Sequence, residues 1–584
     1  MKELRRLRPY FNKYKYKLFL GVLITIAAKI FALFTPRLIG NAFDVIQKGL
    51  DGTLDASTFR SELLWTILYL IGAAVIAGTF TFLMRQTIIN VSRFVEFDLK
   101  NEIYQQYQKL SLNFYKQNRT GDLMSRITED VSKVRMYFGP AIMYSINMIT
   151  LFIVALIYML NTAPSLTLYT MLPLPILSVA IYFLSKLIHK HSTIVQEYLA
   201  KLSTYTQESF SGISVIKTYS IESRIYGAFQ QLAIEQRQKQ IDLARVRAFF
   251  FPLMILLIGT SNILVIYMGG MQYINGEIER VGIIAEFIIY VNMLTWPVAA
   301  IGWVSSLIQE AEASQKRINE FLDVTPEIQN TTEEKVAIKG AISFKNVTFT
   351  YPDTNITALK NLSFHLPEGE ALAIVGKTGS GKSTILELIG RLYDVNSGAI
   401  TIDQRVITKH NLEHLRNAIG YVPQDAFLFS DTISNNIKFG AVNATDDQVV
   451  NAAKMADVHK NIKDFSNGYD TVLGERGITL SGGQKQRISI ARAIIKNPEI
   501  LLLDDCLSAV DTETEEKILN NLKKVSKNKT TVIVSHRVSS AKNADQIIVL
   551  DEGQIIQQGT HDELINQKGY YQDLYEKQLS EKDF

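Results

Sequence analysis

The sequence predicts two parts of different fold class, an all-α membrane domain of six helices followed by an α/β domain. The chain has 584 residues, several times the length of a typical domain, so more than one domain is expected. Long apolar stretches crowd into the first half, whereas the second half carries apolar strands that lead into helical patterns. We place the membrane domain at 1–325, a polar linker at 326–340 and the α/β domain at 341–584.

The composition excludes several classes of protein. Lys and Arg number 61 against 57 Asp and Glu, a formal net charge of +4, so the chain lacks the basic surface of a protein that binds nucleic acid by charge. Its single cysteine, Cys506, excludes an internal disulfide framework and a cysteine-ligated zinc site. Eight scattered histidines argue against a histidine metal centre. We expect no nucleic-acid partner.

Six stretches are long and apolar enough to cross about 30 Å of hydrocarbon at about 1.5 Å per residue. They are Leu18–Gly40, Leu63–Met84, Ala141–Leu160, Leu166–Leu184, Phe249–Tyr273 and Ile283–Leu307. The basic segment before the first stretch places both termini and the α/β domain in the cytoplasm by the positive-inside rule. A cleaved signal peptide is the alternative for the first stretch, but this stretch is long, contains Lys29 and lacks a clear cleavage site.

The connections between the crossings alternate in length. Asn161–Ser165 and Asn275–Val281 are short, whereas Gln86–Arg135 and Lys186–Arg247 are long, charged and helix-periodic. We therefore expect helices that continue beyond the membrane as cytoplasmic stalks able to contact another domain. A solvated helical hairpin without a coupling role is the alternative.

Polar and proline residues interrupt the apolar stretches. Lys29, Asn147 and Glu286 would be costly in lipid, so they should face protein or a water-filled cavity. For Lys29, a substrate cavity and a structural partner or snorkelling are both open. Four prolines predict kinks, which are compatible with alternating access but do not establish it: Pro173, Pro175, Pro252 and Pro297.

A phosphate-binding motif opens the α/β domain. The apolar run ALAIV leads into G-x-x-x-x-G-K-S and then into a helical pattern, which is the strand–loop–helix setting that this motif requires. Backbone N–H groups of such a loop wrap phosphate oxygens, and the following helix N-terminus adds its positive dipole end. We expect Lys382 to hold the β- and γ-phosphates and Ser383 to ligate Mg²⁺. The loop consists of Gly376, Lys377, Thr378, Gly379, Ser380, Gly381, Lys382 and Ser383.

Two carboxylates and a second helix N-terminus follow. The apolar run EILLL ends in Asp504 and Asp505. Because Mg²⁺ needs a ligand at a strand end beside the phosphate loop, we assign Asp504 to the metal and Asp505 to the attacking water. An Asp pair can instead cap a helix, but that would leave the loop without its acidic partner. Ser481, Gly482 and Gly483 precede an amphipathic run suited to a second anion, which predicts a nucleotide held between two copies.

With these motifs in this order, the chain resembles the half-size ABC exporters of the multidrug or lipid type over essentially its full length. In this family a six-helix transmembrane domain is fused to one P-loop nucleotide-binding domain. The resemblance implies that Gly376–Ser383 is the Walker A loop, with Thr384 completing its Ser-Thr pair, that LLLDD is Walker B and that Leu480–Gln484 is the LSGGQ signature. DNA-repair ATPases also carry LSGGQ, but they separate it from Walker A with long coiled coils.

Other residues take their expected roles from the same resemblance. Tyr351 matches the aromatic that stacks on adenine, Gln424 the glutamine that touches Mg²⁺ and reports to the transmembrane helices, and His536 the switch histidine. Ser508–Asp511 matches the D-loop and Gly474–Gly477 the segment before the signature. The implied ATP contacts outside Walker A come from Tyr351, Ser481, Gly482, Gly483, Gln484 and Asp511.

Two stalk segments match the family's coupling segments. Asn113–Val131 resembles the first cytoplasmic coupling segment and Glu208–Glu222 the second. The resemblance implies that each presses on an ATP-binding domain, the second one on the partner's domain in a domain-swapped dimer.

The chain departs from the family where Asp505 stands in place of the usual catalytic glutamate. The shorter side chain holds its carboxylate roughly 1–1.5 Å back, and a misplacement of about 1 Å can cost roughly 100-fold in rate. The expected site binds ATP-Mg²⁺ and hydrolyses it slowly, as in the degenerate-site subunit of a heterodimer. A homodimer in which His536 and an ordered water compensate is the alternative.

These features predict ATP-driven export of a drug- or lipid-like amphipathic substrate by a dimer of half-transporters embedded in lipid. ATP binding would close two nucleotide-binding domains and open the cavity outward. An ATP-gated channel or a regulatory subunit is the alternative function. The substrate class rests on family frequency, and the absence of a targeting extension suggests a bacterial plasma membrane.

Overall fold

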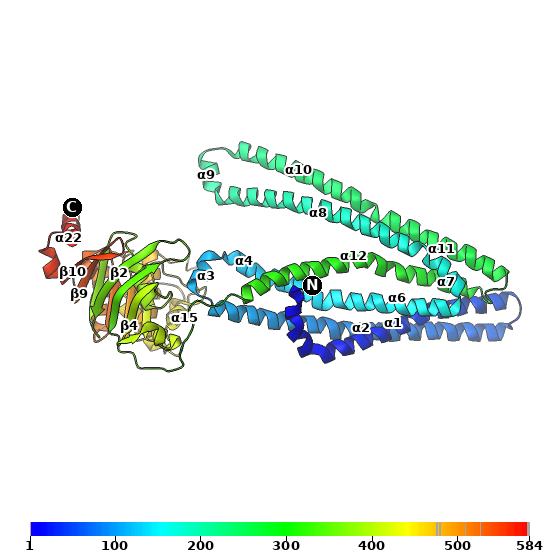
Figure 1. Ribbon diagram of the computed structural model, residues 1–584, viewed down its shortest axis with the longest axis horizontal. Helices are drawn as coiled ribbons and strands as arrows, with labels where there is room; N and C mark the ends of the chain where they lie inside the picture. Colours follow the sequence, from blue (N-terminus) through cyan, green and yellow to red (C-terminus); the bar gives the residue numbers. More distant parts are fainter. Residues whose placement is uncertain (1, 475–476, 478–479, 509, 526, 581–584) are drawn as a thin grey trace. The chain divides into compact units, whose positions relative to one another are not determined.

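The protein divides into two compact units (Figure 1). One comprises Met1–Tyr107 and Gly121–Asp323, and the other comprises Gln108–Thr120 and Val324–Phe584. The second unit therefore includes a short segment from the first half of the chain. The computed structural model describes residues 2–474, 477, 480–508, 510–525 and 527–580.

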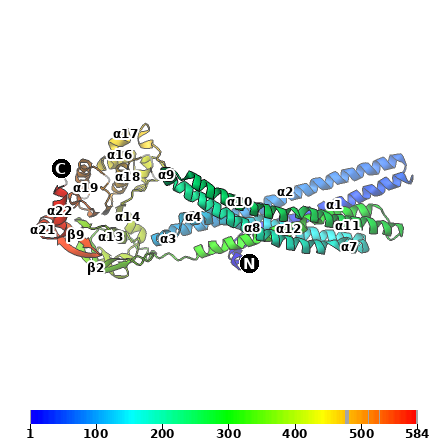
Figure 2. The same ribbon diagram turned by 90° about the horizontal axis from the view of Figure 1, so that it is seen from above.

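Long helices build the first unit, and Figure 2 shows α8 and α10 running side by side to the turn at α9. The helices are η1 Glu3–Leu7, α1 Arg8–Leu50, α2 Ala56–Lys109, α4 Thr120–Ser125, η2 Arg126–Asp130, α5 Val131–Met136, η3 Tyr137–Ala141, α6 Ile142–Thr162, α7 Pro164–Met171, α8 Pro173–Ser211, α9 Ile213–Thr218, α10 Glu222–Ala248, α11 Phe250–Ile274 and α12 Gly282–Leu322. Because α2 and α8 extend far beyond their apolar stretches and α10 is helical throughout, the prediction that helices continue into the long connections is confirmed.

Among the described residues, five helical stretches are long and apolar enough to cross a membrane. They are Glu3–Leu50, Ala56–Lys109, Thr120–Thr162, Glu222–Ile274 and Gly282–Leu322. The predicted crossing Leu166–Leu184 is not among these five, because α7 ends at Met171 and α8 begins at Pro173. Proline has no N–H to continue the hydrogen-bond ladder of a preceding helix, so the apolar run is divided at the predicted kink.

Helices α1 and α12 meet closely through glycine. A Cβ atom on Gly282 would lie 2.1 Å from the carbonyl oxygen of Gly40, so a side chain cannot fit there without moving the backbone. Asp44 accepts hydrogen bonds from the Gly282 N–H at 2.8 Å and from Arg280 Nη1 at 2.9 Å. One turn further along α12, the buried Glu286 carboxylate accepts from the Tyr290 hydroxyl at 3.0 Å and so faces protein.

Two sheets form the centre of the second unit. The four-stranded antiparallel sheet has the order β2-β1-β4-β5, with β1 Ile342–Thr350, β2 Thr357–Leu366, β4 Ser397–Ile402 and β5 Arg405–Val406. The six-stranded sheet has the order β10-β9-β3-β8-β7-β6, with β3 Ala371–Gly376, β6 Ile419–Val422, β7 Ile500–Asp504, β8 Thr530–Val534, β9 Gln546–Asp551 and β10 Gln554–Gly559. All its pairings are parallel except that of β10 with β9. The carboxyl ends of β3, β7 and β8 therefore lie at one edge.

Helices cover these sheets and complete the α/β unit. They are α3 Leu112–Gln117, α13 Lys382–Ile389, η4 Ile407–Lys409, α14 Leu412–Asn417, α15 Ile433–Lys438, α16 Asp446–Met455, α17 His459–Lys463, η5 Gly468–Asp470, α18 Gly482–Ile495, α19 Thr512–Val525, α20 Val538–Ala541, α21 His561–Ile565 and α22 Tyr570–Ser580. A continuous apolar core joins both sheets to α13 through residues such as Phe344, Ile374 and Ile385. The predicted combination of an all-α membrane part with an α/β part is confirmed.

Candidate nucleotide-binding site

The loop between β3 and α13 depends on two glycines with positive φ. At Gly376, φ is 153° and a Cβ atom would lie 2.1 Å from the Leu550 carbonyl oxygen. At Gly381, φ is 99° and a Cβ atom would lie 2.4 Å from the Ala358 carbonyl oxygen. Only glycine accepts both the conformation and the close approach, so the loop is pressed against strands β9 and β2 and its shape is fixed.

Lys382 begins α13 and folds back over this loop. Its Nζ donates to the carbonyl oxygens of Gly376 at 2.9 Å and Lys377 at 2.8 Å. Burial lowers the pKa of Lys382, while the charges of Asp505 and Asp504 partly offset that effect. An ammonium group has three donors, so one remains for a phosphate oxygen. The geometry suits a cation held over bound phosphates.

Ser383 and Asp504 bring a hydroxyl and a carboxylate together. Ser383 Oγ donates to Asp504 Oδ1 at 2.9 Å. Burial raises the pKa of Asp504, the Ser383 hydrogen bond lowers it, and the neighbouring Asp505 charge raises it further. Oxygen ligands of these types are those that Mg²⁺ prefers, and a divalent cation would relieve the desolvated carboxylate. The residues therefore fit a Mg²⁺ ion.

Asp505 has an unusual backbone conformation. Its φ is 41°, in the left-handed region that Asp adopts more readily than most side chains. Its N–H donates to the Val534 carbonyl oxygen at 3.0 Å, which ties it to the end of β8. The side chain is 8% exposed. The backbone of Asp505 is thus fixed, and its short side chain is buried.

A cavity of about 460 Å³ gathers most of the predicted residues. Those that line it are Tyr351, Thr378, Gly379, Gly381, Lys382, Ser383, Thr384, Gln424, Asp504, Asp505 and His536. Of the other loop residues, Gly376 contributes the carbonyl described above, Lys377 pairs with Asp551 at 3.7 Å, and Ser380 is buried. The residues nominated for metal and catalysis thus share one cavity.

Several lining residues were missed by the sequence analysis. They are Ile356, Thr357, Ala358, Lys360, Val534, Glu552 and Gly553. Most belong to β2 or to the hairpin between β9 and β10, which meet where the Lys360 N–H donates to the Gly553 carbonyl oxygen at 2.9 Å. No sequence motif marks these positions, because tertiary packing alone brings them to the loop.

Tyr351 is anchored to α13 by its hydroxyl group. The hydroxyl donates to Glu387 Oε2 at 2.8 Å and lies 2.8 Å from Thr384 Oγ1. Burial raises the pKa of Tyr351, so the phenol stays neutral at neutral pH. Glu387 was also missed, and it lies one helical turn after Ser383 on α13.

The signature residues are elsewhere. Within the described chain, none of Ser481, Gly482, Gly483 and Gln484 lines the cavity. Ser481 caps α18: its Oγ accepts from the Gln484 N–H at 3.3 Å, and Gln484 Oε1 accepts from the Ser481 N–H at 3.0 Å. The first N–H groups of an α-helix have no partner within the helix, and Gly482 in this first turn is exposed. The described N-terminus of α18 is thus capped within the chain and does not line the cavity of the Walker residues.

The described residues of the D-loop, Ser508, Val510 and Asp511, are also absent from the cavity lining. Asp511 Oδ1 accepts from the Thr514 N–H at 2.9 Å and so caps α19. Of the motif residues predicted nearby, Glu475, Arg476 and Ala509 lie outside the described residues. Helix α18 is nevertheless joined to a cavity residue, because Gln486 of α18 donates to the Gln424 carbonyl oxygen at 3.1 Å.

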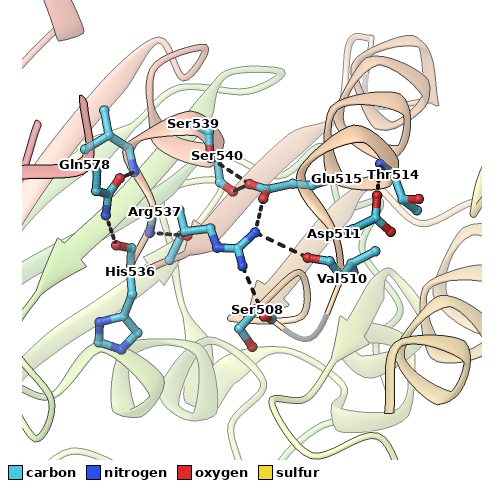
Figure 3. A network of polar contacts seen from close by, with 12 residues as sticks. Ser508, Val510, Asp511, Thr514, Glu515, His536, Arg537, Ser539, Ser540 and Gln578 are labelled. Carbon is cyan, nitrogen blue, oxygen red and sulfur yellow. Dashed lines mark hydrogen bonds and ion pairs between the residues drawn. The ribbon is translucent and has the colours of Figure 1, made fainter. Parts of the chain in front are cut away.

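Arg537 follows His536 in the loop between β8 and α20, here called the switch loop. Its side chain joins this loop to the D-loop (Figure 3). Its guanidinium pairs with Glu515 and donates to the carbonyl oxygens of Ser508 and Val510, each at 3.3 Å. The Glu515 carboxylate is 1% exposed and is satisfied by further hydroxyl donors, Ser539 and Ser540. Removing Glu515 would therefore leave Arg537 without its ion-pair partner, and only its two hydrogen bonds to carbonyl oxygens would still join the loops.

The C-terminal helix holds the backbone of the switch histidine. Gln578 Nε2 donates to the His536 carbonyl oxygen at 2.8 Å, and Gln578 Oε1 accepts from the Val538 N–H at 2.9 Å (Figure 3). Burial and the Lys382 charge lower the pKa of His536, against an opposing effect of Asp505. The imidazole is consequently neutral at neutral pH.

A membrane protein with a nucleotide-binding α/β unit is the class that this fold and site define. The family described as ABC transporter transmembrane region matches residues 18–298, and the family described as ABC transporter matches residues 359–508. The chain belongs to the ABC transporters, as a half-size exporter with an N-terminal transmembrane domain and a C-terminal ATP-binding domain. It is an ATPase coupled to transport and, like other ABC exporters, functions as a dimer.

Full-length relatives share this organisation. The uncharacterized ABC transporter ATP-binding protein YknU of Bacillus subtilis (strain 168) is 36% identical over 99% of this chain and 98% of its own length. The multidrug resistance-like ATP-binding protein MdlA of Escherichia coli (strain K12) is 35% identical over 100% of this chain and 97% of its own. A solved bacterial Atm1-family ABC exporter with ATP bound superposes with a TM-score of 0.78 at 28% identity, covering 96% of this chain and 99% of that chain. The resemblance stated from the motifs is confirmed.

Proposed function

We propose that the chain is one half of an exporter that moves a drug- or lipid-like amphipathic molecule out across the bacterial plasma membrane. The relative MdlA, named as multidrug resistance-like, supports this substrate class. The basic N-terminal segment supports a cytoplasmic location for both termini and for the ATP-binding unit. In this proposal the membrane part covers 1–325, the linker 326–340 and the ATP-binding part 341–584.

The observation that carries the proposal is the separation of the two phosphate-binding elements. The Walker residues share one cavity, whereas the signature terminus of α18 does not line it within the described chain. A second ATP-binding unit can supply its own α18 terminus and D-loop to this cavity. In return, Ser481–Gln484 and Asp511 of this chain complete the partner's site. ATP bound between two units favours their closed arrangement, which is how nucleotide binding can drive the transmembrane helices.

Within the cavity each side chain has a proposed task. Lys382 and the loop N–H groups bind the β- and γ-phosphates, and Tyr351 stacks on the adenine. Ser383, Asp504 and Gln424 hold Mg²⁺, which when bound supplies charge neutralisation for the phosphates. Asp505 orients the attacking water, and neutral His536 donates a hydrogen bond toward the γ-phosphate.

The second coupling segment supports a partner chain. Its turn exposes large apolar side chains, namely Phe210 (72%), Ile213 (48%), Val215 (55%) and Tyr219 (73%). The ATP-binding unit offers a groove of about 550 Å³ beside α15 and α18, at whose rim Phe439 and Val442 are 61% and 83% exposed. We propose that the turn of one chain docks in this groove of the other, since exposed apolar patches of this kind mark interaction sites.

Asp505 determines which dimer is favoured. Its short carboxylate supports slow hydrolysis at this chain's own Walker side, and hence pairing with a different half-transporter whose Walker side is active. The intact signature of this chain would then serve that active site. A homodimer with two slow sites is the second candidate assembly. A channel or regulatory subunit is the second candidate activity.

Native mass spectrometry of the tagged chain, extracted gently from its own membrane, tests the assembly. A second, different half-transporter at one-to-one ratio is expected, and a mass of two identical chains would overturn the heterodimer. The purified complex is then placed in lipid vesicles and given ATP-Mg²⁺ and a lipophilic cationic dye. We expect ATP-dependent dye accumulation that the Lys382→Met variant lacks. Ion conductance without accumulation of any amphipathic probe would instead establish a channel.

A further inference from the structure

The helix α3 is packed into the ATP-binding unit. Leu112 contacts the apolar core beneath the antiparallel sheet. Asn113 Nδ2 donates to Glu327 Oε1 at 2.7 Å, and Ser111 Oγ donates to Glu327 Oε2 at 3.1 Å. These contacts fix α3 on the surface of the unit. Only Leu110 and Ser111 separate α3 from α2, one of the helices long enough to cross a membrane.

Lys116 of α3 reaches the aromatic wall of the nucleotide cavity. Its Nζ lies 4.8 Å from the centroid of the Tyr351 ring and 5.1 Å from that of Tyr393. The two rings are themselves perpendicular, at 88°, with centroids 5.5 Å apart. Tyr351 lines the cavity, whereas Lys116 and Tyr393 do not. The ammonium group therefore contacts Tyr351 from outside the nucleotide cavity.

The Tyr351 ring is held on its other sides as well. Phe349 contacts it at 79° with a centroid separation of 4.9 Å. Its hydroxyl is bound to Thr384 and Glu387, which lie on α13, the helix that begins with Lys382 and Ser383. Lys116 is thus a contact to Tyr351 that comes from the helical half of the sequence, and it connects α3 through Tyr351 to α13.

The lysine carries its charge at neutral pH. Partial burial lowers the pKa of Lys116, but the Tyr393 hydroxyl and the Glu387 carboxylate outweigh burial and raise it. A cation near a tyrosine ring is attracted by the π-electrons. It also withdraws electron density from the ring and restricts its rotation, which prepares the ring for a stacked base.

We infer that Lys116 is a positioning residue that tunes the affinity of the cavity for the purine base and reports the bound base to the first coupling segment. This inference rests on the proposed stacking of adenine on Tyr351. By linkage, if Lys116 strengthens base binding, the bound base strengthens the attachment of α3 by the same factor. The phosphates, which Lys382 and the loop N–H groups are proposed to hold, do not take part in this linkage.

The test compares two ligands that share phosphates but differ in the base. Binding of ATP-Mg²⁺ and of tripolyphosphate-Mg²⁺ is measured on the full dimer in lipid nanodiscs. For Lys116→Met, which keeps the length of the side chain, we expect the ATP Kd to rise about fivefold and the tripolyphosphate Kd to stay unchanged. Lys116→Arg, which keeps the cation, should restore ATP binding. Lys109→Met is the matched control. It removes a positive charge from the last residue of α2, shortly before α3, and the described structure shows no ring contact for this lysine.

Hydrogen exchange over 112–117 gives a second readout. ATP should slow exchange in α3 of the wild type, whereas tripolyphosphate should not, and Lys116→Met should abolish the difference. An equal change of affinity for both ligands, or unchanged ATP affinity in Lys116→Met, would overturn the inference. If the wild type bound tripolyphosphate as tightly as ATP, the adenine role of Tyr351 would fail instead.

Discussion

The Walker side and the signature side of the ATP-binding unit satisfy their polar groups in opposite ways. On the Walker side, Lys382, Asp504 and Asp505 are 6%, 4% and 8% exposed and depend on one another for electrostatic balance. On the signature side, Ser481 is exposed and its capping box with Gln484 is complete within the chain. The Walker side is therefore a set of desolvated charges that a ligand would compensate, whereas the signature side is finished before any ligand binds. Changes on the two sides should separate ATP binding from dimer-dependent hydrolysis.

The largest effect is expected for Lys382→Met. Loss of a buried cation that contacts phosphate should weaken ATP binding by about 3 kcal/mol, more than 100-fold in Kd, because the phosphates lose their compensating charge. The measurement is ATP titration of the purified protein under conditions that do not permit hydrolysis. Lys377→Met, on the exposed side of the same loop, is the matched control and should bind nearly as the wild type does.

Asp505→Glu should act on rate and leave binding unchanged. The longer side chain moves the carboxylate forward by about 1 Å, so turnover at this site should rise by up to about 100-fold. The measurement is single-turnover hydrolysis with a Kd determined in parallel. A rise in turnover without a change in Kd would sharpen the comparison between the Walker side and the signature side. Unchanged turnover would mean that the position of the Asp505 carboxylate does not limit the rate.

Ser481→Ala should leave ATP binding to this chain intact but lower hydrolysis in the dimer about tenfold. It removes one helix cap, worth about 1 kcal/mol, together with a hydroxyl proposed to contact the partner's nucleotide. ATPase assays of the dimer and ATP titration of the same preparation measure the two effects. Ser481→Thr, which keeps the hydroxyl, should restore most of the rate. The comparison would break if Ser481→Ala weakened ATP binding as strongly as Lys382→Met.

The smallest effect is expected for Gln578→Leu. Losing its hydrogen bonds to the His536 carbonyl and from the Val538 N–H should cost about 1 kcal/mol and lower turnover by less than about fivefold. Thermal unfolding with and without ATP, together with ATPase rates, measures both. Gln578→Glu keeps an acceptor for the Val538 N–H, so its stability and turnover should lie between those of the wild type and of Gln578→Leu. A loss of ATP binding would show that the C-terminal helix acts on the Walker side directly.

Local patterns predicted what local chemistry dictates. The loop around Lys382 follows from its glycines, and the placement of Asp504 follows from an apolar strand that must end at the sheet edge. Glu387, Lys360 and Lys116 carried no such signal, since their proximity to the cavity depends on how β2, α13 and α3 pack. The catalytic and metal roles of the motif residues stay predictions until they are measured.

The membrane half shows the same limit. Apolar length predicted the stretches that lie in α1, α2, α6, α11 and α12. It did not predict the division of the fourth stretch at Pro173, where the sequence stays apolar but the backbone loses its hydrogen-bond ladder. Nor could hydropathy indicate that Asp44 would find its donors at Arg280 and at Gly282, the first residue of α12, because those donors are more than 200 residues away in the chain.

The membership of Gln108–Thr120 in the ATP-binding unit has a consequence for biosynthesis. The ribosome makes α3 about 200 residues before Val324, so at roughly 5–20 residues per second the helix waits on the order of 10–40 s before synthesis of the rest of its unit even begins. Throughout that interval Leu112 has no core to enter, and when the last strands finally form they close around a segment delivered by an earlier part of the chain. Completion of the ATP-binding unit thus depends on a segment from the earlier, helical half of the chain.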